Sequence, residues 1–561
     1  MLSVKQETKQ HLDALIAKYK KKYKIEGLAI SVQEGTTPIY QCFKGQASPG
    51  KEVDGSVGFM IGSTTKVFTA LAILQLKDDA KLDLDDPITK HLKNLSIQRQ
   101  KDYAPITIKH LLMHTSGLPG DDLKLMFEAG KPQKEILNRL KHHTLINEPG
   151  VMFAYSNIGY ALLGLIVEQV SGLSYKDYLD KHIFKPLDIA GKILETKALR
   201  DKETNNIAAS YDNKGNVVED PLSVFISAGS STYVSLEDMQ KLAGFFLNKN
   251  EPQLLKPETF KAMVILPEEP HIVKNESRVG LGVRFNYARY NHKDVGEIYG
   301  HGGNTFYHHS LFDIIKDHNL AVNMLNNSKQ GAKFNNKIMP EIIAAIMKDK
   351  GIDIPESLDQ PSKAIPKDKA QRLAKDMVMI GNKLPLRLNK NQELTAKLSF
   401  LKFNLEQCED GLLKPVPRGI AKLKPFKKRL SKFRFLPKTI NEEDMMLIEV
   451  SSAYKRMLVA AASAYRPPKI PQVWQDATGR YTPLDENIKA LITGIKLVHK
   501  KNDLILTLKT PESSNAFYLE PLDAHHAIIQ GYGRGTKETI VLSTKNNKPM
   551  LSIQGLDCAR K

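Results

Sequence analysis

The sequence predicts an α+β domain, with an antiparallel sheet flanked by helices and a separate helical lobe, followed by C-terminal all-β modules. Strand patterns occur near both ends of the first 350 residues, and helical periodicity fills the region between them. A proline-rich segment follows, and alternating apolar and polar residues dominate the remainder. With 41% hydrophobic and 25% charged residues, the chain of 561 has the composition of a folded globular protein.

The first expected elements are a helix and a hairpin. Leu12, Leu15 and Ile16 share one face of an amphipathic N-terminal helix. The runs 28–34 and 38–45 alternate as strands around a turn-forming Gly-Thr-Thr. We therefore expect a hairpin packed on a helix.

Helical periodicity dominates from about residue 64 to 170, and strand patterns return towards the end of the domain. These strands are expected at 280–286, 297–303 and 320–327, before a final helix at 335–349. Strands from both ends of the domain are therefore expected to meet in one antiparallel sheet.

The chain divides into four expected regions. These are a domain at 1–350, a Pro-rich linker at 351–369, a basic β-module at 370–470 and a second β-module at 471–561. A weak repeat supports tandem modules: Asp410-Gly-Leu-Leu matches Asp503-Leu-Ile-Leu, and Lys455-Arg-Met-Leu matches Lys548-Pro-Met-Leu, both at an offset of 93.

The net charge of +19 is concentrated in the C-terminal part. Residues 1–330 carry a net +3, and residues 331–561 carry +16. The densest run is 411–440, with ten Lys or Arg, no acidic residue and interleaved Phe426, Phe433 and Phe435. Such a run binds phosphates or an anionic membrane surface in some proteins, but its alternation also fits a half-buried strand with a solvated basic face.

Several classes of protein are excluded or disfavoured. No apolar run reaches the ~18 residues of a transmembrane helix, and the charged N-terminus is unlike a secretory signal. We therefore expect a cytoplasmic protein, or a periplasmic or secreted one if an export signal precedes the sequence. Cys42, Cys408 and Cys558 lie far apart, and adjacent histidines lack metal-ligand spacing, so no disulfide scaffold, metal or cofactor is expected.

Ser-x-x-Lys occurs three times, but only one copy stands before a helix. Ser399/Lys402 and Ser452/Lys455 lack this context, whereas Ser63 follows a strand-like approach that breaks at glycine. Lys66 then lies one turn further on, on the same face as the hydroxyl. The helix dipole and burial lower the pKa of such a lysine, which favours a neutral amine able to accept the serine proton.

Two further groups carry chemistry. In Tyr155-Ser156-Asn157, a tyrosine beside Lys66 is a candidate base, and the asparagine amide is suited to hold both substrate and lysine. In Tyr299-Gly-His-Gly-Gly-Asn304, glycines inside a strand pattern indicate close approach of another backbone or a ligand.

Taken in this order, the three motifs resemble the serine β-lactamase and penicillin-binding-protein superfamily, specifically its class C-like branch of serine hydrolases. The resemblance covers roughly residues 8–350 and includes flanking signatures. They are Lys81-Leu-Asp-Leu-Asp-Asp-Pro87, Ile106-Thr-Ile-Lys-His-Leu-Leu-Met-His-Thr-Ser-Gly-Leu-Pro119 and Leu163-Gly-Leu-Ile-Val-Glu168.

The resemblance implies a role for each motif residue. Ser63 would be the nucleophile, and Lys66 and Tyr155 would share the role of general base. Asn157 would orient substrate, and His301, Gly302 and Gly303 would form the third-motif strand beside the substrate. The backbone N–H groups of Ser63 and Asn304 would form the oxyanion hole.

One departure bears on the substrate. Most β-lactamases of this branch have Lys-Thr-Gly where this sequence has His301-Gly302-Gly303. A histidine near its ordinary pKa of ~6.5 is only partly charged, so its grip on a substrate carboxylate is weaker. The His-Gly variant resembles esterases, D-amino-acid peptidases and other amidases, several of which carry lipocalin-like C-terminal modules. Trp474-Gln-Asp-Ala-Thr-Gly-Arg-Tyr481 fits the opening of such a module.

The leading hypothesis is a serine acyl-hydrolase acting on a small ester, amide or peptide through an acyl-enzyme. One alternative is a penicillin-binding D,D-peptidase or weak β-lactamase. An alternative of another class is a protein that binds an anionic surface or partner through 411–440, with a degenerate hydrolase domain. The oligomeric state stays open.

Overall fold

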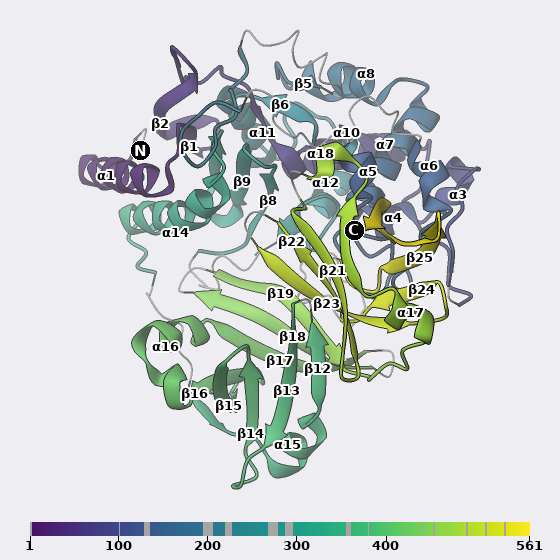
Figure 1. Cartoon of the computed structure of the whole chain (residues 1–561). Helices are drawn as coiled ribbons and strands as arrows, with labels where there is room; N and C mark the ends of the chain where they lie inside the picture. Colours follow the sequence, from purple (N-terminus) through teal and green to yellow (C-terminus); the bar gives the residue numbers. More distant parts are fainter. Residues whose placement is uncertain are drawn as a thin grey trace.

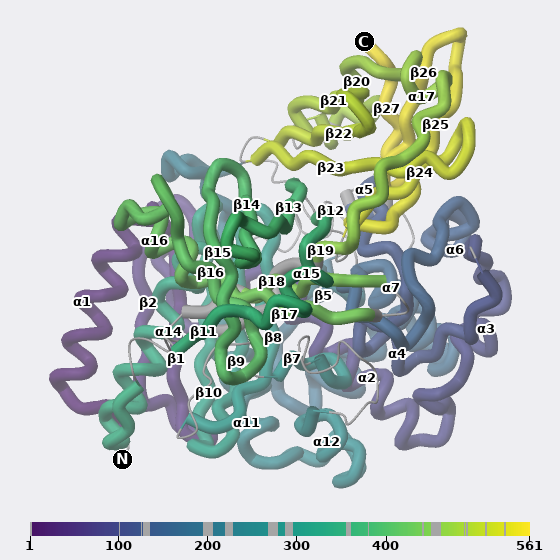
Figure 2. The backbone as a smooth tube through the Cα atoms, turned by 90° about the horizontal axis from the view of Figure 1, so that it is seen from below, coloured from purple at the N-terminus to yellow at the C-terminus, as the bar shows by residue number. Residues whose placement is uncertain are grey.

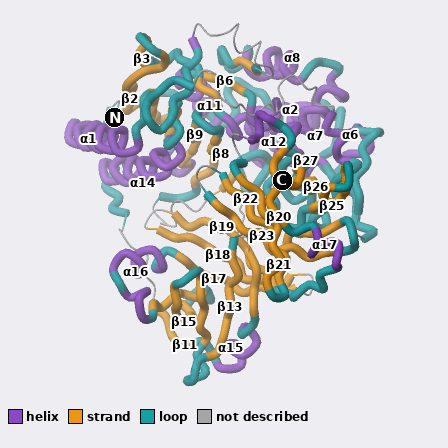
Figure 3. The backbone as a smooth tube through the Cα atoms, viewed as in Figure 1, coloured by secondary structure: helices purple, strands orange, loops and turns teal. Residues whose placement is uncertain are grey.

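The computed structural model contains an α+β domain followed by two closed β-barrels (Figure 1). It describes residues 3–99, 101–127, 135–194, 206–218, 227–266, 279–285, 295–354, 361–379, 381–440, 443–452, 455–489, 492–510, 513–531 and 535–561. Strands fill the C-terminal part, and most helices lie in the first domain (Figure 3). The predicted plan, α+β followed by all-β modules, is confirmed.

The main sheet of the first domain is antiparallel and joins strands from both ends of the domain. Its order is β3-β2-β1-β10-β9-β8-β7. The bounds are β1 Gly27–Glu34, β2 Thr37–Ser48, β3 Lys51–Glu52, β7 Arg284–Phe285, β8 Ile298–Asn304, β9 His309–Ile315 and β10 Leu320–Asn326. The sequence pattern missed β9, and of the strand expected at 280–286 only β7 forms, Asn286 lying outside the described residues.

Apolar side chains cover both faces of this sheet. On one face, Leu12 and Ile16 of α1 (Gln6–Tyr23) pack with Ile30 of β1 and Phe334 of α14 (Gly331–Asp349). On the other, Ala29 joins the larger core, which includes α11 (Leu236–Leu247). The alternation along β1 therefore buries both of its faces.

The helical lobe stands against that second face. Its elements are η1 Gly62–Thr64, α2 Thr65–Asp78, α3 Ile88–His91, α4 Ile108–Leu112, α5 Leu123–Phe127, α6 Glu135–Leu140, α7 Asn157–Ser171, α8 Tyr175–Leu179, a π-turn at Asp180–Phe184, α10 Ser227–Ser230 and α12 Pro257–Met263. A small sheet, β4 Phe59–Met60, β6 Thr232–Val234 and β5 Lys192–Ile193, leads the chain into α2.

The first barrel has eight antiparallel strands, because β15 pairs with β16 and so closes the ring from β12 to β19. Its bounds are β12 Asp376–Met379, β13 Asn382–Leu388, β14 Leu394–Leu398, β15 Leu401–Cys408, β16 Leu413–Pro417, β17 Phe433–Ile440, β18 Glu443–Ser452 and β19 Lys455–Ala464. Inward-facing residues such as Leu384, Phe403 and Met446 form its core. Closure leaves no sheet edge within the ring.

The second barrel repeats this architecture with β20 to β27. Its bounds are α17 Gln472–Asp476, β20 Gly479–Pro483, α18 Glu486–Lys489, β21 Gly494–Lys500, β22 Asp503–Lys509, β23 Ser514–Pro521, β24 His526–Ile529, β25 Thr539–Lys545, β26 Lys548–Ile553 and β27 Leu556–Arg560. Trp474 and Tyr481 are buried in its core, and the Trp474 indole N–H donates to the Asp523 carbonyl. This is the lipocalin-like module expected from the sequence around Trp474.

Three sequence interpretations need correction. Residues 355–360 of the expected linker lie outside the described residues, but β11 (Ser362–Ala364) pairs with β15, and α15 (Lys367–Leu373) follows, so this part belongs to the first barrel. The basic run 411–440 is not one strand, since η5 (Gly419–Lys422) and α16 (Lys424–Leu430) separate β16 from β17.

The third correction concerns the repeat at an offset of 93. Asp410 precedes β16, the fifth strand of its barrel, whereas Asp503 begins β22, the third strand of the other. Lys455 and Lys548 likewise begin non-equivalent strands, β19 and β26. Every strand of an up-and-down barrel follows a turn and alternates apolar and polar residues. Short sequence matches therefore arise between strands at different positions in their barrels.

Both barrels contact the first domain near the motifs of interest. Leu436, Met445 and Leu447 of β17 and β18 pack on Val151 and Met152. The tip between β26 and β27 reaches the segment before α5, which lies beside the second barrel in Figure 1 and Figure 2.

Among the described residues, no single helix combines the length and apolar character needed to cross a bilayer. Only α7 taken together with the bent segment Tyr175–Phe184, at 76° to it, meets that criterion.

Candidate active site

Ser63 lies where the chain passes from β4 into α2. Gly62 has φ +52°, and a Cβ on it would lie 3.1 Å from the Asn304 backbone nitrogen. Both the left-handed backbone and the close approach therefore require glycine here. Ser63 itself is partly exposed, while its neighbours on both sides are buried, so its hydroxyl is the accessible group of this turn.

Lys66 is fully buried one turn into α2, as the Ser-x-x-Lys spacing predicts. Its Nζ lies 3.3 Å from Ser63 Oγ, 2.8 Å from Asn157 Oδ1 and 2.8 Å from the Gly229 carbonyl oxygen. Three acceptors match the three protons of an ammonium group. The lysine is therefore held in one place with its head group pointing at the serine.

Tyr155 approaches the serine from the other side. Its hydroxyl donates to Ser63 Oγ at 2.8 Å, and its ring lies 5.1 Å from Lys66 Nζ. The His114 ring lies against the Tyr155 ring, with centroids 4.3 Å apart, while His114 Nδ1 accepts from the Ser156 backbone N–H at 3.1 Å. His114 thus fixes both the ring and the backbone that presents the tyrosine.

Asn157 is the first residue of α7, and its side chain joins two buried groups. Ser156 caps this helix by accepting from the Gly159 N–H. The Asn157 amide nitrogen donates to Asp121 Oδ1 at 2.7 Å while its oxygen accepts from Lys66, which fixes the orientation of the amide. The backbone N–H of Asn157 also donates to the Gly120 carbonyl at 2.8 Å.

The third motif lies on β8, beside the turn that carries the serine. A Cβ on Gly303 would lie 1.7 Å from the Ile61 carbonyl oxygen, whereas the nearest atom to a Cβ on Gly302 is 3.5 Å away. The close approach expected from the glycines therefore exists at Gly303. Gly302 and Asn304 are at least partly exposed, and the backbone of Asn304 lies next to that of Gly62.

His301 differs from the expectation of a partly charged side chain. It is 4% exposed, and burial, followed by the nearby charges of Arg284 and Lys66, lowers its pKa well below the ordinary 6.5. Its Nδ1 lies 2.8 Å from the Gly302 carbonyl, which can only accept, so Nδ1 carries the proton and Nε2 is the free acceptor. His301 is thus a neutral group beside two cations.

The other two Ser-x-x-Lys copies do not form comparable sites. Ser399 lies in the turn between β14 and β15 with φ +56°, and Lys402 is on the following strand. Ser452 and Lys455 are backbone partners in the β18–β19 ladder. Neither pair shares a helix face, which agrees with the interpretation from sequence context.

Sequence reasoning missed four groups that hold the site. They are Asp121, the Gly229 carbonyl, His114 and Arg284. Asp121 lies two residues after the quoted signature that ends at Pro119, and His114 lies within it, so their positions in or beside a motif were an available signal. Arg284 lies in the strand expected at 280–286, whereas no pattern marks the segment of Gly229, and only the fold brings the two residues to Tyr155 and Lys66.

The arrangement can pass a proton and stabilise negative charge. Two atoms able to exchange a proton, Tyr155 Oη and Lys66 Nζ, lie within 3.3 Å of Ser63 Oγ. The Arg284 guanidinium lies 5.4 Å from the Tyr155 ring centroid and adds a permanent positive charge. The site therefore combines a partly exposed serine hydroxyl, two groups that can exchange a proton with it and a nearby cation.

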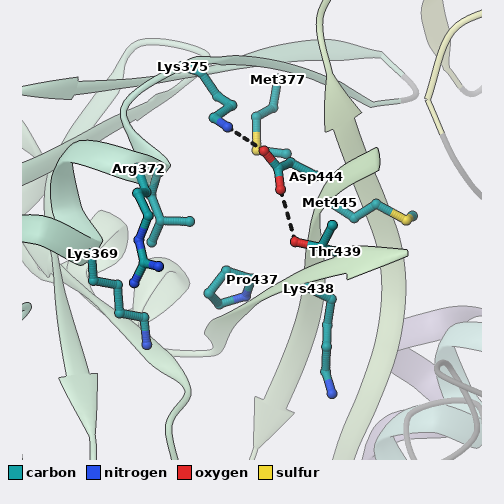
Figure 4. A pocket seen from close by; sticks show the side chains of 10 residues that line it. Lys369, Arg372, Lys375, Met377, Pro437, Lys438, Thr439, Asp444 and Met445 are labelled. Carbon is teal, nitrogen blue, oxygen red and sulfur yellow. Dashed lines mark hydrogen bonds and ion pairs between the residues drawn. The ribbon is translucent and has the colours of Figure 1, made fainter. Parts of the chain in front are cut away.

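A separate cavity of about 370 Å³ lies on the first barrel, between α15 and β12, β17 and β18 (Figure 4). Lys375 forms an ion pair with Asp444 there and lowers the pKa of that carboxyl, and Thr439 donates to the same group. None of the predicted site residues lines this cavity.

Comparison with known proteins supports the resemblance. The model of the Beta-lactamase family matches residues 12–345. Protein flp of Staphylococcus aureus strain MW2 is 29% identical over 265 residues, which cover 46% of this chain and 51% of that protein. Penicillin-binding protein 4* of Bacillus subtilis strain 168 is 25% identical over 382 residues, or 64% of this chain and 81% of that protein. The match thus spans about half the length of the S. aureus relative.

Two solved structures show the same fold. The octameric penicillin-binding protein homologue from Pyrococcus abyssi has a TM-score of 0.52 at 19% identity, covering 98% of this chain and 99% of that one. SurE, crystallised with D-Leu, has a TM-score of 0.56 at 20% identity, covering 82% of this chain and 100% of that one. At these identities the likeness concerns the fold alone.

Proposed function

The chain belongs to the beta-lactamase family, and on that premise we propose that it is a serine acyl-hydrolase that cleaves ester or amide bonds through an acyl-enzyme on Ser63. The observation that carries the proposal is the position of the partly exposed Ser63 Oγ, 2.8 Å from Tyr155 Oη and 3.3 Å from Lys66 Nζ. A serine activated by adjacent bases is the arrangement that nucleophilic catalysis needs.

In the proposed reaction, the Tyr155–Lys66 pair starts with one proton fewer than a phenol and an ammonium together hold. Ser63 Oγ attacks the substrate carbonyl carbon while its proton passes to that pair. The new oxyanion accepts from the backbone N–H groups of Ser63 and Asn304. The leaving alcohol or amine takes the proton as its bond to carbon breaks, and the acyl group stays on Ser63. Water then attacks the acyl-enzyme, gives a proton to the same pair, and releases the acid as Ser63 recovers its proton.

The position of Arg284 favours a second, narrower candidate function, in which the acyl donor carries a carboxylate near the bond that is cleaved. Its guanidinium lies 5.4 Å from the Tyr155 ring and 5.7 Å from the Phe153 ring, on the side of the site where the neutral His301 offers no charge. Guanidinium groups bind carboxylates in a bidentate manner. A peptidase acting on peptide C-termini, and slow acylation by penicillins, both fit this candidate.

The central experiment is covalent labelling of the purified full-length chain with a fluorophosphonate, followed by mass mapping of the labelled peptide. We expect one label, on Ser63, and hydrolysis of a p-nitrophenyl ester. Ser63→Ala should lose both, while the matched variants Ser399→Ala and Ser452→Ala keep both. A folded protein that is neither labelled nor active would instead support a degenerate hydrolase domain.

The proposed preference for acyl donors that carry a carboxylate is tested with a matched pair of substrates. Wild type and Arg284→Gln would be assayed on a neutral ester and on its analogue with a carboxylate two bonds beyond the acyl carbon. We expect Arg284→Gln to raise KM for the charged ester about tenfold or more and to leave the neutral ester nearly unchanged. Equal effects on both esters would contradict the preference for a carboxylate but would still agree with the proposed hydrolase activity.

A further inference from the structure

Three large apolar side chains are exposed together at one end of the first barrel. Phe400 in the turn between β14 and β15 is 54% exposed, and Ile420 and Leu423, around the end of η5, are 54% and 56% exposed. We refer to Phe400, Ile420 and Leu423 as the barrel-end patch. Contiguous apolar exposure on a folded protein marks an interaction surface more often than isolated exposed residues do.

The members of the barrel-end patch lie on segments that contact one another. The Phe400 ring meets the Phe426 ring edge to face with centroids 5.5 Å apart, and the Phe426 N–H donates to the Leu423 carbonyl. The Leu423 N–H donates in turn to the Ile420 carbonyl. The patch is therefore one surface built by the β14–β15 turn, η5 and α16.

This surface is held firmly by the barrel and is not a detached segment. Ala421 and Leu430, which alternate with the exposed residues along η5 and α16, are buried in the barrel core at 0% and 1% exposure. The Arg418 N–H donates to the Lys402 carbonyl at 3.1 Å and ties η5 to β15. The fold thus turns Ile420 and Leu423 outward while it buries their neighbours.

Exposed cations surround the patch. They are Lys402, Arg418, Lys422, Lys424, Lys427 and Lys428. The run 411–440 contains no acidic residue, and none of these six forms an ion pair within the part of the chain that the structure describes. In Figure 1 and Figure 2, α16 lies on the same side of the molecule as α1.

We propose that the barrel-end patch docks on the surface of an anionic lipid bilayer, with Phe400, Ile420 and Leu423 inserted at the level of the head groups and the surrounding cations against the lipid phosphates. Exposed apolar side chains flanked along the chain by exposed cations match an interface that is anionic outside and apolar below. This inference does not depend on the proposed hydrolase activity.

Two other occupants fit the same surface less well. A second copy of the chain, related by a two-fold axis, would set the cations of one patch against those of the other, which is unfavourable. A nucleic acid would use the cations and could stack on Phe400, but it offers no apolar environment for the aliphatic Ile420 and Leu423. A bilayer satisfies the apolar and the cationic residues together.

Vesicle co-sedimentation of the full-length chain tests the proposal. Vesicles of phosphatidylcholine with an equal part of phosphatidylglycerol are compared with phosphatidylcholine alone, at low and physiological salt. We expect binding only to the anionic vesicles. The triple variant Phe400→Ser/Ile420→Ser/Leu423→Ser should weaken binding about tenfold or more, and Lys422→Glu/Lys424→Glu/Lys427→Glu should abolish it, since each Lys or Arg contributes roughly fivefold near such a surface.

The matched control is Leu484→Ser/Leu522→Ser, which removes the two apolar side chains on the second barrel that are 50% and 53% exposed. It should bind vesicles like wild type. Thermal unfolding of each variant verifies that the barrel is intact. Full binding by the apolar triple variant would overturn the proposal, as would equal binding to neutral vesicles. Binding of the chain to duplex DNA at a salt concentration that releases the vesicles would also overturn the proposal, if the apolar substitutions leave this DNA binding unchanged.

Discussion

The carboxylate of Glu538, in the second barrel, accepts a hydrogen bond from the backbone N–H of Gly120 in the first domain at 3.2 Å, and both groups are buried. The Gly120 carbonyl accepts from Asn157, and Asn157 holds Lys66. The contact between domains is extended by the Leu123 N–H, which donates to the Gln554 carbonyl, and by Arg139, which donates to the Gly555 carbonyl and to Asp122. A barrel residue thus supports the segment that positions the lysine.

Removal of this carboxylate is expected to lower catalysis without touching the reacting groups. In Glu538→Ala the buried Gly120 N–H loses its acceptor, which costs about 1–3 kcal/mol and loosens the segment that holds Asn157. We expect kcat on a p-nitrophenyl ester to fall about tenfold with KM little changed. Glu538→Gln keeps an acceptor and should restore most of kcat. The neighbouring Lys537→Ala, which removes an ion pair with Glu443 and leaves Glu538 in place, is the control. Wild-type kcat in Glu538→Ala would show that residues 120–123 hold their position alone.

Glu538 also predicts how stability depends on pH. Burial raises the pKa of the Glu538 carboxyl from an ordinary 4.5 to about 7, and the nearby charge of Asp121 contributes to this increase. The folded state therefore binds more protons than the unfolded state between these values, and stability falls as pH rises from 4.5 to 7. The loss amounts to about 3 kcal/mol. Glu538→Gln should raise Tm relative to wild type at pH 8 and have little effect at pH 5. An equal Tm difference at both pH values would contradict this assignment.

The sequence was informative where a local pattern and a fold requirement coincide. Lys66 lies in the first turn of α2, so the Ser-x-x-Lys spacing already implied that it faces Ser63, whereas the resemblance implied the roles of Tyr155 and Asn157 before α7 and at its start. The sheet of the first domain followed in the same way, because α1 and β1 carry clear periodicity.

Long-range contacts were not predictable from local patterns. Glu538 lies 418 residues from Gly120, and nothing in its own strand pattern marks it as a contact of the first domain. Likewise, β11 is short and exposed, and only its pairing with β15 distinguishes it from a linker. The neutrality of His301 depends first on its burial and then on Arg284, which the chain brings to it from a neighbouring strand.

The role of general base is expected to be shared between Tyr155 and Lys66. The tyrosine oxygen is closer to Ser63 Oγ than the lysine nitrogen, at 2.8 against 3.3 Å, whereas the lysine also holds Asn157. Tyr155→Phe and Lys66→Ala should each slow acylation by ~10²–10⁴-fold in single-turnover labelling. Since Lys66 is buried, Lys66→Ala leaves a cavity. Lys66→Met removes the amine but fills most of that space, so it serves as the control for cavity formation. An unchanged acylation rate in Tyr155→Phe would remove the tyrosine from the proton path.

Limited proteolysis tests where the first domain ends. Pairing of β11 with β15 and burial of Ala370 in α15 should protect residues 362–373, so cleavage in this region is expected before Ser362. Mass spectrometry of the fragments identifies the site. Because both barrels contact the first domain, the fragments should co-elute in gel filtration after the cut. Cleavage within 362–369 would restore the original assignment of that segment as linker.

His301 is expected to remain neutral throughout the physiological pH range. Because burial, then Arg284 and Lys66, lower its pKa well below 6.5, the stability that depends on neutral His301 is complete above pH 6.5 and is lost as pH falls towards the lowered value. In a histidine-labelled sample, the NMR signal that disappears in His301→Gln should keep its neutral position from pH 8 to 6.

Replacement of His301 by a permanent cation is the stronger test. His301→Lys would bury a third positive charge beside Arg284 and Lys66, and should cost about 3 kcal/mol or more in stability at pH 7. A midpoint near pH 6.5 in the titration, or a His301→Lys variant as stable as wild type, would mean that this strand is solvated and that the histidine is free to charge.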